Sequence, residues 1–531
     1  MESNTYDALS WEHSLRSHVI ATCVAIFLLT WIARTLLLTD ALANVPAVGK
    51  GSRWARRKQY TSGSPWDLRS GKAQTISALP QQRVHDPTPR LPISSDISKA
   101  GETIVVSSKF LPELKKLPDE VLSMSEAISE ILQSSYTKVP PTVPGLPHIV
   151  KSYLTPALIR LNSMIAKDVH ESMALELPQT TDWSEVNINE SVLRIIAMVS
   201  GRVFVGPELC RNEEYLDAAV NYTIDVMTAA YFVSYVPQWL RPIVSPFLPQ
   251  INRLNKRLEE AISLLRPVIT ARQEASDDSN DVKPDDMLQW LIDSQSTNGE
   301  VDVQKLAEMQ LSAIFAAIHT TSLVTTNAFY TLASMPEIIP VLQEDVKQAL
   351  EVTNGEFTNS SIQNMKKLDS FLKEILRFHT LGASSFNRKV IRPFNLSNGQ
   401  HIPAGVNLEL PAGGIAYDEN IFPSPNTFDP LRFYNLRQSK NDETSGKKAV
   451  EVVASSQFVG VGATSLTFGY GRHACPGRFF AANEIKMILA ATLLHYEIKN
   501  PPGVDERHKN IMHGSHVGFA LPEYIYDTNA R

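Results

Sequence analysis

The sequence predicts a mainly helical protein with a small β-sheet region, preceded by one N-terminal transmembrane helix. Apolar residues recur with the helical period of about 3.6 residues through 111–272 and 303–334. The pattern changes to short strands within 391–410, around a turn at 397–399. No internal repeat or low-complexity hinge divides the 531-residue chain, so residues 101–531 are predicted to form one large domain.

A long apolar stretch near the N-terminus predicts a membrane anchor. The run SHVIATCVAIFLLTWIA, residues 17–33, contains no acidic, lysine or arginine side chain, and after Arg34 the apolar character continues to residue 38. At about 1.5 Å per residue, a helix over 17–38 spans about one bilayer core of ~30 Å. Basic residues follow this span, so we expect an anchor in residues 1–40, in the endoplasmic reticulum membrane, with the rest of the chain in the cytosol. A cleaved signal peptide is the alternative, although no clear cleavage site is present.

The segment after the anchor, residues 41–100, is predicted to be a basic juxtamembrane stretch followed by a loop. Residues 60–98 are rich in proline, serine and glutamine and show no regular apolar pattern, which favours a loop. The next stretch, GETIVVSS at 101–108, is predicted to contain a strand. Residues 435–450 are polar and charged, so we expect a solvated loop there.

Two proline-rich stretches break the helical pattern. VPPTVPGLP occupies 139–147, and VPQWLRPIVSPFLP occupies 236–249. The second stretch is apolar and aromatic. A substrate-entrance or membrane-touching loop and a buried connection between helices are both consistent with it.

Charge and cysteine content exclude several classes of protein. The formal net charge of −6 gives no reason to expect nucleic acid as a partner. The three cysteines, Cys23, Cys210 and Cys475, are far apart and odd in number, which favours a reducing compartment over a disulfide framework. No CxxC or HxxxH pair indicates a zinc site, and no CxxCH motif indicates covalent haem attachment.

One of these cysteines lies in a highly constrained loop, FGYGRHACPG, residues 468–477. Pro476 favours the first turn of a helix, and the apolar residues that follow predict a buried helix with Cys475 at its N-terminus. The helix dipole and the free N–H groups favour a thiolate there, and the glycines allow close approach of another group. A haem-iron ligand requires this combination. A catalytic nucleophile and a structural cysteine are the alternatives.

The loop resembles the haem-binding loop of the cytochrome P-450 monooxygenases. The matching positions are Phe468, Gly469, Gly471, His473, Cys475 and Gly477. The resemblance implies a cytochrome P-450 fold, a haem-thiolate catalytic domain over 101–531, and haem b with Cys475 as the axial iron ligand. It also implies that Phe468, Gly469 and Gly477 contact the cofactor, and that His473 and Arg388 reach haem propionates. The tryptophan and arginine that often bind a propionate from an early helix are missing around 148–158.

Two upstream motifs support the resemblance. KEILR places Glu374 and Arg377 three residues apart, on one face of a helix, and FDPLRF contains Arg432. The resemblance implies that these three side chains form a buried structural charge network, in which one carboxylate is shared by two guanidinium groups. A second ExxR pair, Glu208 and Arg211, is predicted to be a solvated pair.

The oxygen-binding side is predicted to lie on the helix at 303–334. Its middle is rich in hydroxyl side chains, which are poor choices for a helix interior, and such a conflict is expected at a functional site. AAIHTT resembles the distal-helix signature of the family, with Thr320 beside bound oxygen and Thr321 next to it. His319 stands where the family commonly has an acidic residue. The predicted catalytic residues are therefore His319, Thr320 and Thr321. A threonine-rich turn of a core helix is the alternative.

The resemblance implies a monooxygenase that hydroxylates, epoxidises or repeatedly oxidises an apolar natural product. Similarity to filamentous-fungal members suggests a terpenoid or meroterpenoid of secondary metabolism. Electrons would come from NADPH-cytochrome reductase on the same membrane, with cytochrome b5 as a further candidate donor. We expect substrate contacts from 313–321, 381–386 and 512–519. A haem-thiolate isomerase, dehydratase or cyclising enzyme, and a non-catalytic membrane-anchored haem sensor, are the alternatives.

Overall fold

The structure is a computed structural model of the chain. It describes residues 93–98, 101–276, 283–296, 301–441, 454–508, 510, 512–513, 516–517 and 525–528. The expected membrane span at 17–38 lies outside these residues. Within them, none of the helices combines the length and the hydropathy that crossing a bilayer requires.

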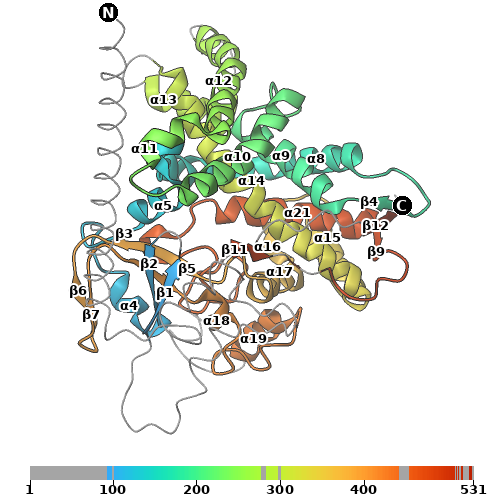
Figure 1. Ribbon diagram of the computed structural model, residues 1–531. Coiled ribbons are helices and arrows are strands. Elements are labelled where there is room, and N and C mark those ends of the chain that lie inside the picture. Colours follow the sequence, from blue (N-terminus) through green and yellow to red (C-terminus); the bar gives the residue numbers. More distant parts are fainter. Residues whose placement is uncertain are drawn as a thin grey trace, which may run out of the picture.

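Helices make up most of the described chain, and α14 crosses the centre of the molecule (Figure 1). Helices α9, α10 and α12 lie on one side of α14, and α15 and α17 on the other. The long helices are α8 (Thr155–Glu176), α9 (Ile188–Phe204), α10 (Glu213–Tyr235), α12 (Pro249–Ser276), α13 (Met287–Ser296), α14 (Val303–Ser334), α15 (Ile339–Glu351), α17 (Lys366–Phe378), α19 (Arg432–Asn441) and α21 (Arg478–His495). Shorter ones are α4 (Leu111–Leu114), α5 (Met124–Leu132), α6 (Ser134–Thr137), α7 (Leu146–Ile149), α11 (Arg241–Val244), α16 (Asn359–Asn364) and α18 (Ala412–Ala416).

Local signals explain why α14 begins and ends where the sequence predicts. The side chain of Asp302 accepts a hydrogen bond from the backbone N–H of Lys305, which caps the first turn. The helix ends at Ser334, two residues before Pro336, whose ring cannot continue a helix. The prediction of one helix over 303–334 is confirmed.

The main sheet has five strands in the order β1-β2-β8-β5-β3. Its strands are β1 (Ile93–Ser98), β2 (Gly101–Val106), β3 (Leu122–Ser123), β5 (Ser385–Val390) and β8 (Asn407–Leu410). The pairs β1–β2, β5–β8 and β3–β5 are antiparallel, and β2–β8 is parallel. The strand predicted after residue 100 is confirmed as β2.

Three smaller sheets complete the strands of the described chain. They are formed by β4 (Ser184–Val186), β12 (Ile525–Thr528) and β9 (Glu497–Lys499); by β6 (Phe394–Asn395) and β7 (His401–Ile402); and by β10 (Met512–His513) and β11 (His516–Val517). The turn predicted between β6 and β7 is confirmed. Gly399 there has a φ of 83°, and its N–H donates to the carbonyl of Leu396 at 2.8 Å.

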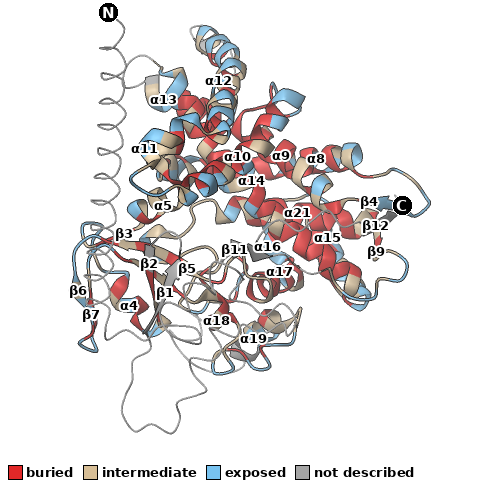
Figure 2. Ribbon diagram, viewed as in Figure 1, coloured by how far each residue is buried: buried red, intermediate tan, exposed pale blue. Residues whose placement is uncertain are grey.

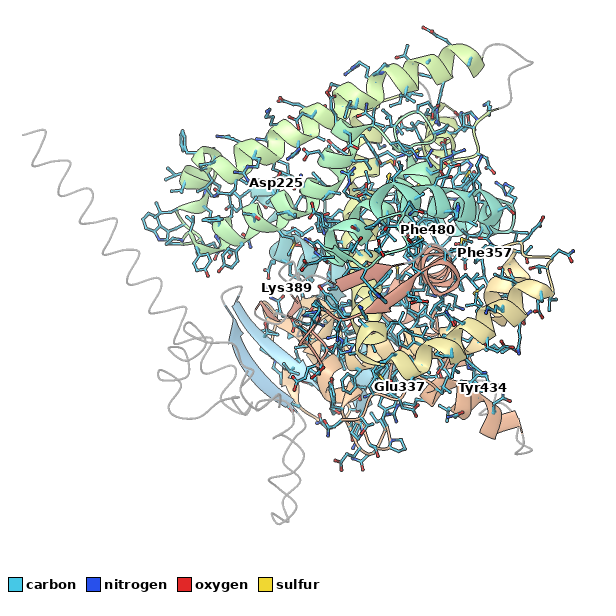
Figure 3. All side chains as sticks on the ribbon, turned by 90° about the vertical axis from the view of Figure 1, so that its right-hand side faces the viewer. Asp225, Glu337, Phe357, Lys389, Tyr434 and Phe480 are labelled. Atoms are coloured by element: carbon cyan, nitrogen blue, oxygen red, sulfur yellow. The ribbon has the colours of Figure 1, made fainter. Side chains whose placement is uncertain are left out.

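Two segments predicted as loops contain regular structure. Strand β1 lies inside 60–98, because its register with β2, from Ile93 opposite Val106 to Ser98 opposite Gly101, supplies backbone partners that a local apolar pattern does not reveal. Helix α19 extends to Asn441, inside the stretch 435–450. It is anchored on α17 by polar contacts, since the Tyr434 N–H donates to Ser370 Oγ at 2.9 Å, and Tyr434 is labelled on this helix in Figure 3.

The buried side chains form two clusters. The larger cluster fills the space among α8, α9, α10, α14, α17 and α21, and the smaller one lies on the main sheet. Figure 2 shows red, buried stretches on α9, α14 and α21. Phe480, labelled near the middle of Figure 3, packs its ring 5.5 Å from that of Phe204. The start of α21 is therefore fixed in the larger core, directly after Cys475.

Candidate active site

The cysteine loop, residues 468–477, closes on itself through backbone contacts. The N–H of Cys475 donates to the carbonyl of Phe468 at 2.7 Å, and the N–H of Gly469 donates to that of Leu466 at 2.9 Å. Gly469 has a φ of 71°, and a Cβ there would lie 2.9 Å from the carbonyl oxygen of His473. Glycine is therefore required at this position by both conformation and space.

Cys475 is partly buried at the beginning of α21. Burial raises the pKa of its thiol above the ordinary value, and the backbone N–H groups of Gly477 and Arg478 lower it by a smaller amount. The N–H groups at the helix N-terminus therefore act in the expected direction, towards the thiolate, but do not by themselves offset burial. A metal ion at the sulfur would add positive charge, because a coordinating thiol is deprotonated by the metal.

A cavity of about 200 Å³ lies between this loop and strand β5. Two basic side chains, Arg388 and His473, line it together with Asn387. Arg388 is buried, and within the described residues its guanidinium forms no ion pair; Nη1 donates to the carbonyl of Asn387 at 2.8 Å. Burial lowers the pKa of Arg388 to about 10. Burial also lowers the pKa of His473, and the positive charge of Arg388 lowers it further by a smaller amount.

These features fit the carboxylates of a haem. A buried guanidinium without an anion is unfavourable, and a propionate group in the cavity would supply that anion. The donor set therefore fits haem on two counts, since Cys475 offers a sulfur ligand at the start of α21 and the buried guanidinium of Arg388 forms no ion pair within the described residues. Among the described residues, no hydrogen-bond partner is found for Asn387 Oδ1, which is also buried. The sequence did not indicate Asn387, because an asparagine inside a strand gives no recognisable signal.

The three predicted catalytic residues on α14 have different surroundings. Thr320 is exposed, and its hydroxyl donates to the carbonyl of Ala316 at 2.7 Å. Ala316 lies one turn earlier and is exposed as well, whereas His319 and Thr321 are buried. His319 Nε2 lies 2.7 Å from the carbonyl oxygen of Val220 on α10, and burial lowers the pKa of this histidine. His319 is thus a neutral donor that joins α14 to α10.

The predicted charge network lies on α17 and at the start of α19, with a backbone contact from the segment before α19. Glu374 is fully buried. Arg377 donates from Nη2 to Glu374 Oε1 at 2.7 Å and from Nε to Oε2 at 2.8 Å, and Arg432 donates from Nε to Oε1 at 3.1 Å. The N–H of Asp429 donates to the same carboxylate at 3.0 Å. One buried carboxylate is therefore fully satisfied by two cations and a backbone group.

The second ExxR pair does not interact as predicted. Glu208 pairs with Arg272 at 3.0 Å, and Arg272 is buried. Arg211 instead pairs with Asp168 at 3.0 Å and Glu171 at 2.6 Å. The prediction of a solvated Glu208–Arg211 pair is wrong, because each side chain has an oppositely charged partner on another helix.

Two further charged residues of α17 were missed. Asp369 and Lys373 are buried, one helical turn apart, on the helix that carries Glu374. Their position in an otherwise apolar stripe was a usable signal, since acidic and lysine side chains are almost never fully buried unless they are paired.

Comparison with known proteins identifies the family. Residues 150–529 match the family model for cytochrome P-450. Cytochrome P-450 monooxygenase ATR3 of Stachybotrys chlorohalonatus is 39% identical over 427 residues, covering 80% of this chain and 88% of that protein. Cytochrome P-450 monooxygenase BOA4 of Botryotinia fuckeliana is 33% identical over 495 residues, covering 93% and 92%. Among solved structures, a retinoic acid-bound cyanobacterial P-450 superposes with a TM-score of 0.63 at 16% identity, covering 82% of this chain and 92% of that one.

The chain belongs to the cytochrome P-450 family. It has the family's mainly helical fold with small sheets, and it is a haem-thiolate monooxygenase. Its cofactor is haem held by a cysteine thiolate.

Proposed function

We propose that Cys475 is the axial ligand of haem b in a monooxygenase that oxidises an apolar natural product. The observation that carries this proposal is the position of Cys475 at the start of α21, beside the cavity that Arg388 and His473 line. The backbone N–H of Cys475 is fixed there by its hydrogen bond to the carbonyl of Phe468. Cys210 is the other cysteine of the described chain, and it is buried near Asp168, where burial and this carboxylate raise its pKa.

Each group at the site has a separate role. Cys475 Sγ would hold the haem iron, and Arg388 and His473 would bind the propionates. When bound, haem supplies the activation of molecular oxygen, and thiolate ligation favours O–O cleavage. Phe468, Gly469 and Gly477 form the surface on which the cofactor rests.

Thr320 moves protons on the oxygen side. Its Oγ1–H donates to the Ala316 carbonyl at 2.7 Å, so its lone pairs are left to accept a hydrogen bond from water. Thr321 and His319 support the local conformation of α14. Buried His319 holds its position against Val220, and the hydroxyl of Thr325 donates to the carbonyl of Thr321 at 2.9 Å.

The proposed substrate is a terpenoid or meroterpenoid, and its contacts come from 313–321, 381–386 and 512–519. Phe386 lines the cavity, and Ala316 and Ala317 present small side chains on α14. Such surfaces suit an apolar ligand with few polar groups. The proposed electron donors are NADPH-cytochrome reductase and, as a second donor, cytochrome b5.

The proposed location is the endoplasmic reticulum membrane, with a single N-terminal span and the catalytic domain in the cytosol. Exposed aromatic and aliphatic side chains gather along the end of α10 and the segment that follows. They are Tyr231, Phe232, Tyr235, Trp239, Ile243 and Phe247. Phe247 is 80% exposed and Ile243 is 62% exposed, so a buried connection between helices is wrong for 236–249. An apolar patch of this kind supports contact with lipid.

Reconstitution tests the proposal. The purified full chain is placed in lipid vesicles with NADPH-cytochrome reductase, isotope-labelled O2 and a panel of terpenoids and meroterpenoids. The proposal predicts products that carry the label and require NADPH. Thr320→Val is expected to lower the product formed per NADPH consumed. Thr325→Val serves as the control with little change, because Thr325 is a buried threonine of the same helix outside the proposed contacts.

Two other outcomes of the reconstitution would contradict the proposed monooxygenase function. Turnover that needs neither reductase nor O2 would identify an isomerase, dehydratase or cyclising enzyme. Binding of apolar ligands without any product across the panel would favour a haem sensor.

A further inference from the structure

We propose that Asp369 is a positioning residue that holds both ends of the cysteine loop, residues 468–477, and so keeps Cys475 in place as an iron ligand. This inference rests on the proposed role of Cys475. It concerns a carboxylate on α17 that does not touch the cofactor cavity and is separate from the network around Glu374.

The carboxylate of Asp369 connects three segments. Its Oδ1 lies 2.7 Å from Lys486 Nζ on α21. Its Oδ2 accepts hydrogen bonds from Arg437 Nη1 at 2.9 Å and from the backbone N–H of Phe458 at 3.0 Å. Burial raises the pKa of Asp369, but Lys486 and Arg437 outweigh burial and lower it below the ordinary value. The group is therefore an anion whose partners lie before and after the cysteine loop.

The contact with Phe458 reaches the first residue of the loop. Phe458 is fully buried, and its ring packs edge to face on that of Phe468, with centroids 5.7 Å apart and an angle of 80°. The carbonyl of Phe468 accepts the N–H of Cys475 at 2.7 Å. A displacement of Phe458 is therefore passed through one ring contact and one hydrogen bond to the backbone of Cys475.

The contact with Lys486 fixes the other end. Helix α21 begins at Arg478, three residues after Cys475, and Lys486 lies about two turns further along it. Asp369 contacts α21, which follows the loop, and Phe458, which precedes it. The two segments that flank the loop are therefore held by the same buried carboxylate.

Lys373, one turn further along α17, strengthens the hold before the loop. Its Nζ donates to the carbonyl of Gly460 at 2.6 Å and to Ser465 Oγ at 2.8 Å. Gly460 cannot accept a side chain without displacement, since a Cβ would lie 2.5 Å from the carbonyl oxygen of Ala454. The segment from Phe458 to Ser465 is thus tied to α17 at two points.

Asp369→Asn tests the inference. The asparagine keeps the shape but leaves Lys486 and Arg437 without their anion. The measurement is the rate at which the dithionite-reduced, CO-bound full-length holoprotein changes from the red-shifted Soret band of thiolate ligation to the ordinary band. We expect the variant to convert about fivefold faster than wild type or more, which corresponds to a free-energy difference of about 1 kcal/mol.

Asp286→Asn is the matched control. Asp286 is equally buried, pairs with Arg272 at 2.7 Å and accepts the N–H of Gln289 at 2.9 Å, on a different side of the core. This control is expected to lower the melting temperature without accelerating the spectral conversion. Equal conversion rates in Asp369→Asn and wild type, or equal acceleration in Asp286→Asn, would overturn the inference.

Phe458→Leu provides the test if Asp369→Asn does not accumulate as holoprotein. It removes the ring contact with Phe468 and leaves the carboxylate and its cations intact. Faster conversion supports the inference, and an unchanged rate refutes it. Failure of the proposed function looks different, because wild type itself would then lack the red-shifted band.

Discussion

The guanidinium carbon of Arg388 lies 4.0 Å from the ring centroid of Phe386, on a strand whose backbone is turned to a φ of 59° at Phe386. A positive φ is an outlier for an aromatic residue and costs about 1–3 kcal/mol. Strand β5 shows a register shift against β8 between Ser385 and Arg388. Strain of this kind is concentrated at ligand sites, and here it accompanies a cation held against a ring at the cavity.

Replacement of Arg388 is therefore expected to weaken haem retention. In Arg388→Leu, the rate of haem transfer to an excess of apomyoglobin should rise roughly tenfold or more, because a hydrogen bond to a charged group contributes ~1.5–3 kcal/mol. Arg392→Leu, an exposed arginine just beyond the same strand, is the control and should leave the rate unchanged. Equal rates for both variants would show that Arg388 does not contact the cofactor.

The Glu374 network is expected to contribute strongly to stability. Glu374→Gln leaves the two guanidinium groups of Arg377 and Arg432 without their shared anion, which should cost about 3–5 kcal/mol. The exposed carboxylate of Glu213, paired with Arg194 at 2.9 Å, provides the control, and Glu213→Gln should cost less than about 1 kcal/mol. Thermal melting of the two holoproteins measures the difference. Similar melting temperatures would contradict a structural role for the network.

A buried acid on α21 predicts a specific pH dependence. Glu484 is fully buried, accepts a hydrogen bond from Ser200 Oγ at 2.8 Å, and has a pKa that burial raises to about 8 from an ordinary value of 4.5. Between these values the folded protein retains a proton that the unfolded chain releases. The contribution to stability is therefore complete below pH 4.5 and is lost as the pH rises towards 8.

Glu484→Gln removes this titration. We expect the free energy of unfolding of wild type, followed by thermal melting, to fall relative to that of the variant as the pH is raised from 5 to 8. The slope is at most about 1.4 kcal/mol per pH unit. Parallel curves for the two proteins across this range would show that Glu484 does not hold the proton.

The sequence predicted the fold best where the signal was local. The apolar period, the Asp302 cap and Pro336 define α14, and the turn at Gly399 defines the β6–β7 hairpin. Strand β1 and the part of α19 from residue 435 onwards were missed because partners distant from the local pattern stabilise them. For α19, the ion pair between Arg437 and Asp369 at 2.9 Å joins residues 68 positions apart.

Contacts between residues distant in the sequence also limit what the sequence could show about the site. The loop around Cys475 is recognisable because Gly469 and Gly471, both at positive φ, stand within a few residues of Cys475 and Pro476. The pairing of Glu208 with Arg272, and the three contacts of Asp369, depend on helices that meet only in the folded protein. No spacing rule along the chain predicts them.

The central claim is thiolate ligation by Cys475, and the absorption spectrum of the reduced protein with carbon monoxide tests it most directly. Wild type and Cys210→Ala, which removes the other cysteine of the described chain, should both show the red-shifted Soret band of a haem thiolate. Cys475→Ala should lose this band. A band that persists in Cys475→Ala, or is lost in Cys210→Ala alone, would contradict the account.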